Sequence, residues 1–194
     1  MTDRIVFAGK NWRAALRWAF VLLVGAVVVG STPGSLSAAE AEQPRYSGRF
    51  DLIDGEAAAA ERDGSVREVA QIFPALFRKM AIGKMRKAAN IVSFVEFAWG
   101  DGSVTIRSDA SEGWKTGLDK SEEEFRAKDG KRFLLSRWME DGVLYSKARG
   151  ETGIRSSKFQ LSEAGDVLTV STTIQIDRAE KPIVYTARYL RATP

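Results

Sequence analysis

Beyond residue 90, apolar and polar residues alternate along most of the chain. In the clearest run, 167–176, Leu168, Val170, Ile174 and Ile176 share one face, and threonine, serine and glutamine occupy the other. A period of two, bounded by Gly-containing turns, is typical of strands with one buried face. The pattern predicts nine strands here, at residues 91–99, 103–108, 114–118, 123–128, 131–140, 143–149, 153–162, 167–176 and 183–191.

A helical period occupies the region before residue 90. The alanines at 57–60 favour a helix, which Asp63-Gly64-Ser65 can interrupt and recap. Apolar residues then recur at helical spacing through residues 66–80. Pro74 fits the first turn of a second helix that ends near Ala89. The segment therefore predicts two short helices, or one kinked helix.

A further strand at residues 46–53 precedes the helices and brings the total to ten. Short strands joined by tight turns form antiparallel meanders, and closing them into a barrel removes the exposed edges of an open sheet. We predict a mainly β domain at residues 46–194. It is an antiparallel up-and-down barrel of about ten strands, with a helical pair inserted between the first two.

The N-terminus has the order of a secretory signal peptide. Basic residues from Arg4 to Arg17 precede an apolar run, Trp18 to Gly30, and the small residues 37–39 follow. The apolar run rises only about 20 Å as a helix, against a bilayer core of about 30 Å. We therefore predict cleavage after Ala39 or Ala41, rather than an uncleaved anchor. Residues 1–39 are then the signal peptide, residues 40–45 a flexible N-terminus, and the protein is periplasmic or secreted.

Charge and missing residue types narrow the function. The chain carries +4, of which the predicted leader holds +3, so the remaining +1 gives no reason to expect a nucleic-acid partner. Cysteine and histidine are both absent. Disulfides, zinc or haem sites built on these residues, and Ser-His-Asp or Cys-His catalysis are therefore excluded. We expect no cofactor and no metal, and no catalytic motif stands out.

The segment Tyr46-Ser47-Gly48-Arg49-Phe50-Asp51-Leu52 resembles the aromatic-x-Gly-x-Trp-x-Leu opening of the lipocalin and fatty-acid-binding-protein superfamily, with Phe50 at the Trp position. The overall pattern is also similar to exported bacterial barrel proteins. The fatty-acid-binding branch closes with an Arg-x-Tyr pair that holds a carboxylate. This chain has Arg188-Tyr189 instead, so that role is not carried over. The resemblance implies an apolar cavity with the helical pair across its mouth.

Six residues are candidates for ligand binding. Arg137 interrupts an apolar alternation in 131–140 and is the choice for an anionic head group. Arg188 and Glu96 also lie on the same face of their predicted strands as apolar neighbours, although each strand residue could instead point outward. A buried Glu96 would need a partner and could act as a general acid. The full set is Arg137, Arg188, Glu96, Phe73, Phe77 and Trp138, and core packing is the alternative for the aromatic residues.

The predicted second helix is strongly basic. It carries Arg78, Lys79, Lys84, Arg86 and Lys87 with no intervening acid. Beside apolar residues, these cations could contact an anionic membrane surface transiently during ligand transfer. The alternative is a solvated helix face.

These observations favour an exported binding or carrier protein for a small hydrophobic or amphipathic molecule held in the barrel. Two alternatives stay open. One is a structural or interaction protein whose barrel is filled by its own side chains, and the other, less favoured, is an enzyme that works without histidine or cysteine. An open cavity separates the carrier from the filled barrel.

Overall fold

The computed structural model describes residues 45–127 and 130–193. The predicted signal peptide and most of the predicted flexible N-terminus lie outside the described residues. Neither described helix has the length and apolarity that a bilayer-spanning segment requires.

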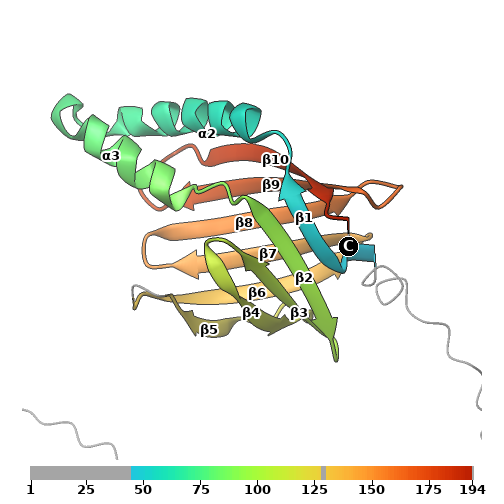
Figure 1. Ribbon diagram of the computed structural model, residues 1–194. Helices are drawn as coiled ribbons and strands as arrows, with labels where there is room; N and C mark the ends of the chain where they lie inside the picture. Colours follow the sequence, from blue (N-terminus) through green and yellow to red (C-terminus); the bar gives the residue numbers. More distant parts are fainter. Residues whose placement is uncertain (1–44, 128–129, 194) are drawn as a thin grey trace, which may run out of the picture. The chain divides into compact units, whose positions relative to one another are not determined.

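Ten strands form one antiparallel sheet in the order β4-β3-β2-β1-β10-β9-β8-β7-β6-β5 (Figure 1). Their bounds are β1 (Gly48–Leu52), β2 (Phe94–Gly100), β3 (Ser103–Ser108), β4 (Ser111–Gly117), β5 (Glu123–Arg126), β6 (Arg132–Glu140), β7 (Val143–Gly150), β8 (Gly153–Leu161), β9 (Val167–Ile176) and β10 (Ile183–Arg191). Strands β1 to β4 cross in front of β6 to β10. The predicted fold class is confirmed: a mainly β, nearly closed barrel of ten strands, with two helices between β1 and β2.

Side chains close the seam between the two ends of the strand order. Strand β4 lies against β6, but a single bridge, Asp119 to Trp138, is the only pairing described there. The Trp114 ring packs edge-on against Phe133 at 5.0 Å between ring centroids. Aromatic contact therefore replaces a hydrogen-bonded ladder at this seam.

Asp-Gly pairs make two of the hairpin turns. Asp101 and Gly102 both have positive φ, at 48° and 68°, and Asp141 and Gly142 follow at 51° and 73°. Two consecutive positive φ angles match the turn that fits the twist of paired strands, and Asp-Gly is a preferred sequence for it. The turns thus sit where the sequence pattern predicted.

The helical pair differs from the prediction in one respect. Helix α2 (Gly55–Val69) runs unbroken, a 3₁₀ turn (Ala70–Ile72) follows, and α3 (Ala75–Ala88) begins after Pro74. The predicted interruption at 63–65 is wrong, because its polar side chains find partners outside the helix backbone. The Asp63 carboxylate pairs with Arg62 and Arg86, and the Ser65 hydroxyl accepts a hydrogen bond from β10.

Helix α2 covers a free edge of β10. Strand β1 ends at Leu52, so the N-terminal half of β10 has no strand beside it on that side. The side chains of Asp54 and of two α2 residues accept hydrogen bonds from its backbone N–H groups. Ser65 Oγ accepts from Val184 N–H at 2.9 Å, Glu61 Oε2 from Thr186 N–H at 2.9 Å, and Asp54 Oδ1 from Arg188 N–H at 2.8 Å. The helix therefore protects an edge that would otherwise be exposed for pairing (Figure 1).

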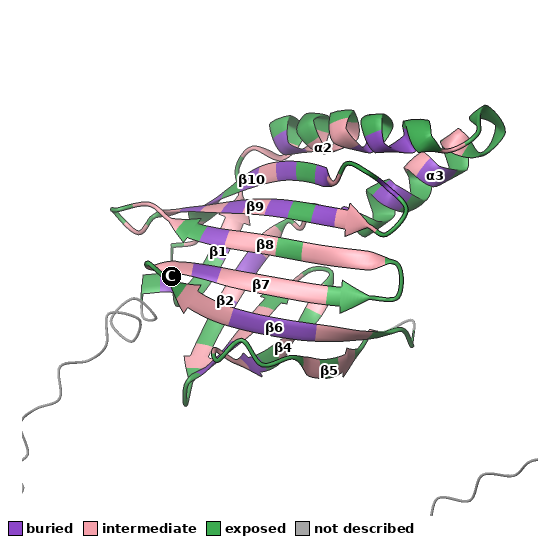
Figure 2. Cartoon of the chain, turned by 180° about the vertical axis from the view of Figure 1, so that it is seen from behind, coloured by how far each residue is buried: buried purple, intermediate pink, exposed green. Residues whose placement is uncertain are grey.

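Two hydrophobic clusters fill the two ends of the barrel. Tyr46, Phe50, Phe97 and Phe159 anchor the first, with ring centroids 5.5–6.0 Å apart around Phe97. The second joins inward-facing residues of β9 and β10 to the helical pair and contains Val66, Val69, Ala70, Ala81, Met85, Ile174, Ile183 and Tyr185. Buried and exposed positions alternate along β10 (Figure 2). The helical pair thus packs over one end of the barrel interior.

Candidate ligand-binding site

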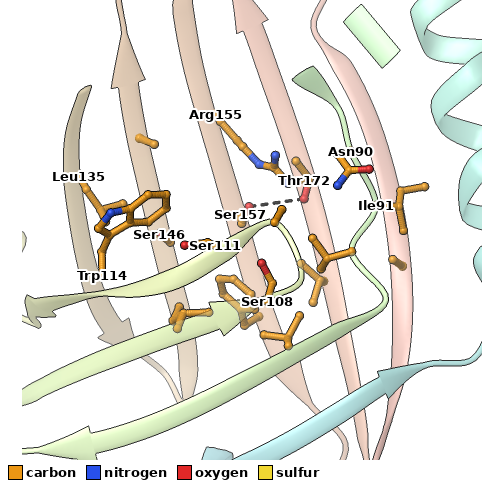
Figure 3. A pocket seen from close by; sticks show the side chains of 18 of the residues that line it. Asn90, Ile91, Ser108, Ser111, Trp114, Leu135, Ser146, Arg155, Ser157 and Thr172 are labelled. Carbon is orange, nitrogen blue, oxygen red and sulfur yellow. Dashed lines mark hydrogen bonds between the residues drawn. The ribbon is translucent and has the colours of Figure 1, made fainter. Parts of the chain in front are cut away.

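A cavity of about 280 Å³ lies between the two clusters. Its walls come from both sides of the barrel and from residues 90–92, which connect α3 to β2 (Figure 3). No residue of either helix lines it. The apolar lining residues are Ile91, Val92, Val95, Ile106, Ala110, Trp114, Phe133, Leu135, Ala148, Phe159, Val170 and Ala187. This apolar surface suits the body of a small organic molecule.

Hydroxyl groups interrupt that apolar wall on both sides. Ser108 and Ser111 come from β3 and β4, and Ser146, Ser157 and Thr172 come from β7, β8 and β9. The Ser157 and Thr172 hydroxyl oxygens lie 3.4 Å apart (Figure 3). The cavity can therefore accept polar groups as well as hydrocarbon.

Arg137 is buried at the seam and lines the cavity. It is 3% exposed, and its Nη1 donates to Val104 O at 3.0 Å, Trp114 O at 2.6 Å and Thr116 Oγ1 at 3.2 Å. Burial lowers the pKa of the guanidinium to about 10, against the opposing attraction of Glu123. Its buried Nε has no hydrogen-bond partner among residues 45–127 and 130–193. Arg137 thus ties β6 to β3 and β4 and keeps one donor unused.

A second arginine stands near the helical end of the cavity. Arg155 Nη2 donates to the Tyr185 hydroxyl at 3.1 Å, and Nη1 donates to Ala88 O at 3.4 Å. The Tyr185 hydroxyl donates in turn to Asn90 O at 3.3 Å. These bonds hold the start of the α3–β2 connection against the barrel wall, with a guanidinium beside the cavity.

Tyr189 also holds the α3–β2 connection, two residues further along the chain. Its hydroxyl donates to Val92 O at 3.3 Å. Burial is the main reason that the pKa of Tyr189 lies above its usual value, and nearby Tyr185 raises it further. The phenol therefore stays neutral and serves as a donor.

Two predicted site residues, Arg188 and Glu96, face away from the cavity. Arg188 lies exposed on the outer face of β10, between inward-facing Ala187 and Tyr189. Glu96 is half-buried on the outer face of β2 and lies 4.0 Å from Arg107 in an ion pair. Neither lines the cavity, and Glu96 is not the buried acid that general acid catalysis would need.

The three aromatic candidates also lie elsewhere. Trp138 stacks on Tyr145 outside the barrel, with ring centroids 5.3 Å apart, under the Lys120 ammonium. Phe73 packs in the cluster beneath the helical pair, and Phe77 is half exposed on α3. Of the six predicted site residues, Arg137 alone lines the cavity.

Arg155, Ser157 and Thr172 line the cavity but were absent from the predicted site. A signal for Thr172 existed, because it interrupts the apolar face between Val170 and Ile174 just as Arg137 interrupts its own strand. Arg155 and Ser157 lie on the same face of β8 as buried Phe159, but polar residues occur on both faces of this strand. That strand offered no clean alternation from which to choose a face.

Comparison with known proteins identifies the fold. No protein-family model and no curated sequence matches the chain. A secretary abundant heat soluble (SAHS) protein from Ramazzottius varieornatus has 10% identity and a TM-score of 0.50, over 76% of this chain and 96% of that one. A Schistosoma mansoni fatty acid binding protein in complex with arachidonic acid has 12% identity and a TM-score of 0.48, over 78% and 99%. Zebrafish ileal bile acid-binding protein complexed with cholic acid has 13% identity and a TM-score of 0.47, over 76% of this chain and 99% of that one.

At such identities a structural likeness establishes the fold alone. The first of these matches, with a TM-score of 0.50 over 76% of this chain, supports the barrel fold described above. The chain shares its barrel fold with this SAHS protein, and a small β-barrel is what the Tyr46–Leu52 resemblance implied.

Proposed function

We propose that the protein binds and carries a small amphipathic anion in the barrel cavity. The observation that carries this proposal is the buried Nε of Arg137, which has no partner among the described residues. A buried donor without an acceptor costs about 1–3 kcal/mol, and more when the group is charged. An anionic oxygen that reached it would recover this cost, while the apolar wall would hold the hydrocarbon part.

Cavity size supports a carrier over a barrel filled by its own side chains. The volume of about 280 Å³ lies just below the usual range for small-molecule sites, about 300–1,000 Å³. A ligand with a medium-length chain fits this space better than one with a long chain. Titration calorimetry with sodium decanoate should therefore show one binding site, with tighter binding than for decanol. Binding of neither compound would overturn the proposal.

The pH dependence of decanoate binding should reflect the arginine. Arg137 has a pKa of about 10, below its ordinary value, so it keeps its proton up to about pH 9 and loses it as the pH rises through 10. The ligand carboxyl group, with a pKa near about 4–5, is ionised above that range. We expect a constant affinity between about pH 6 and 9, and weaker binding on either side. A loss of half the affinity between pH 7 and 9 would contradict this assignment.

Export is part of the proposal. The basic lead from Arg4 to Arg17, the apolar run Trp18 to Gly30 and the small residues 37–39 support it. N-terminal sequencing of protein from the cell envelope and medium should find chains that begin at Glu40 or Glu42. Membrane-bound protein that still carries Met1 would contradict cleavage.

We further propose transient contact of α3 with an anionic lipid surface. Leu76 is 84% exposed, Phe77 and Met80 are at least half exposed, and the exposed Lys79 and Lys84 lie on the same helix. Exposed apolar side chains among cations suit the interface of an anionic bilayer.

Vesicle binding tests the lipid contact. The protein should bind phosphatidylglycerol vesicles and not phosphatidylcholine vesicles, and salt should weaken the binding. Leu76→Ser should reduce the bound fraction several-fold, because it removes the most exposed apolar side chain of α3. Leu190→Ser, at an exposed apolar site on β10, should have no effect. Equal binding to both lipids would contradict the proposal.

A further inference from the structure

A row of polar side chains crosses the cavity wall that β6 to β10 form. Strand register places directly paired residues side by side on one face. Arg137 on β6 pairs with Ser146 on β7, Ser146 with Ser157 on β8, Ser157 with Thr172 on β9, and Thr172 with Tyr185 on β10. All five line the cavity. We call Ser146, Ser157 and Thr172 the hydroxyl row.

The next inward-facing row is apolar throughout. It consists of Met139, Leu144, Phe159, Val170 and Ala187, which pair in the same way across the same five strands. The row on the other side holds Leu135, Ala148, Arg155, Ile174 and Ile183. Hydroxyl groups are thus gathered at one level of the barrel, the level that continues from Arg137.

The two central hydroxyls are poorly satisfied by each other. Thr172 is 1% exposed, and its Oγ1 lies 3.4 Å from Ser157 Oγ, beyond the usual O–H···O range of about 2.5–3.0 Å. Buried hydroxyls stabilise a fold only when they are well bonded, and alanine and valine would fill the same places without that cost. A ligand group placed between them and the opposite wall would supply a closer hydrogen-bond partner than the two hydroxyls offer each other.

We infer that the ligand carries a second hydrogen-bonding group, a hydroxyl or carbonyl, remote from its anionic end. This inference rests on the proposed function. Neighbouring strands lie about 4.8 Å apart, so Ser157 and Thr172 stand two and three strands, about 10–14 Å, from the backbone of Arg137. An acid with a hydroxyl at the far end of a medium-length chain has this spacing. A saturated fatty acid would leave the hydroxyl row facing hydrocarbon.

Decanoate and 10-hydroxydecanoate test the inference, because they differ only in the terminal hydroxyl. The purified protein should bind 10-hydroxydecanoate about fivefold to tenfold more tightly, the effect of about one hydrogen bond. The double variant Ser157→Ala/Thr172→Val should reverse this preference. Ser156→Ala/Thr173→Val is the matched control, since this pair has the same residue types on the same strands, one position along, on the outer face. The control should keep the original preference.

The outcomes separate this inference from the proposed function. Equal affinity for the two acids in the unmodified protein, or an unchanged preference in the Ser157→Ala/Thr172→Val variant, would overturn the inference and leave the carrier proposal standing. Binding of neither acid would overturn both. Decanoate affinity also reports folding: the double variant should bind decanoate at least as tightly as the unmodified protein, because its cavity wall is more apolar.

Discussion

Replacing Arg137 by methionine should weaken decanoate binding about tenfold to a hundredfold and leave decanol binding nearly unchanged. A hydrogen bond between a charged donor and an anion is worth about 1.5–3 kcal/mol, which corresponds to this range. Methionine keeps a similar length and removes the charge. Titration of both ligands against both proteins measures the effect. Equal loss for decanoate and decanol would mean that Arg137 serves the barrel seam and not the ligand.

Arg188→Met is the matched control for this substitution. Arg188 is an exposed arginine on a strand of the same barrel, and it faces away from the cavity. Its replacement should change neither affinity. Arg137→Met also removes the hydrogen bonds from Arg137 Nη1 to Val104 O and Trp114 O. Circular dichroism must therefore show that this variant is folded at the titration temperature.

Gly153→Ala should be among the most destabilising single substitutions in the chain, with a loss of about 3 kcal/mol or more in the free energy of unfolding. Gly153 opens β8 with a φ of 157°, and a Cβ there would lie 2.1 Å from Gln175 O on β9. Backbone, unlike the end of a flexible side chain, cannot move aside without breaking the β8–β9 pairing. Urea unfolding followed by tryptophan fluorescence measures the change.

Gly150→Ala provides the control in the same hairpin. Its added Cβ would be 4.0 Å from its nearest neighbour, Gly153 O, and its φ is not in the left-handed region. This substitution should change stability by less than about 1 kcal/mol. Unfolding of the two variants at the same urea concentration would contradict the close packing of the β8 and β9 backbones at Gly153.

The sequence predicted the strands best where one face of the strand is apolar and the other polar. The predicted bounds 167–176 and 183–191 match β9 and β10. The second strand was predicted to begin at Ile91, whereas β2 begins at Phe94, since residues 90–92 are held at the cavity mouth by hydrogen bonds from Tyr185 and Tyr189. Tertiary contacts of this kind leave no periodic signal.

The assignment of inward residues from the alternation of apolar and polar positions was wrong where the outer face of a strand is also apolar. Arg188 shares parity with Val184 and Leu190, but both are more than 40% exposed on the outside of β10. Glu96 shares parity with Phe94, whose ring lies under the Arg49 guanidinium at 4.2 Å outside the barrel. Alternation alone states which residues share a face and not which face is inside.

The cavity and its hydroxyl row could not be predicted from the sequence, because they depend on register. A shift of one residue in the pairing of β8 or β9 with its neighbours would move Ser157 or Thr172 to the outer face. The inward position of Arg137 could be predicted, because its strand is otherwise apolar on that side, with Leu135 and Met139 as neighbours. Its hydrogen bonds across the seam to β3 and β4 join residues more than 20 positions apart in the chain.

Amide ¹H–¹⁵N spectra recorded during a sodium decanoate titration test the central claim most directly. If the barrel interior is the binding site, shifts should saturate at one equivalent and should be largest for cavity residues such as Ala148, Ser157 and Thr172, together with the Arg137 Nε–H. Outer-face residues such as Arg188 and Trp138 should change little. Shifts confined to α3 or to the outer face, or the absence of any saturable change, would contradict ligand binding inside the barrel.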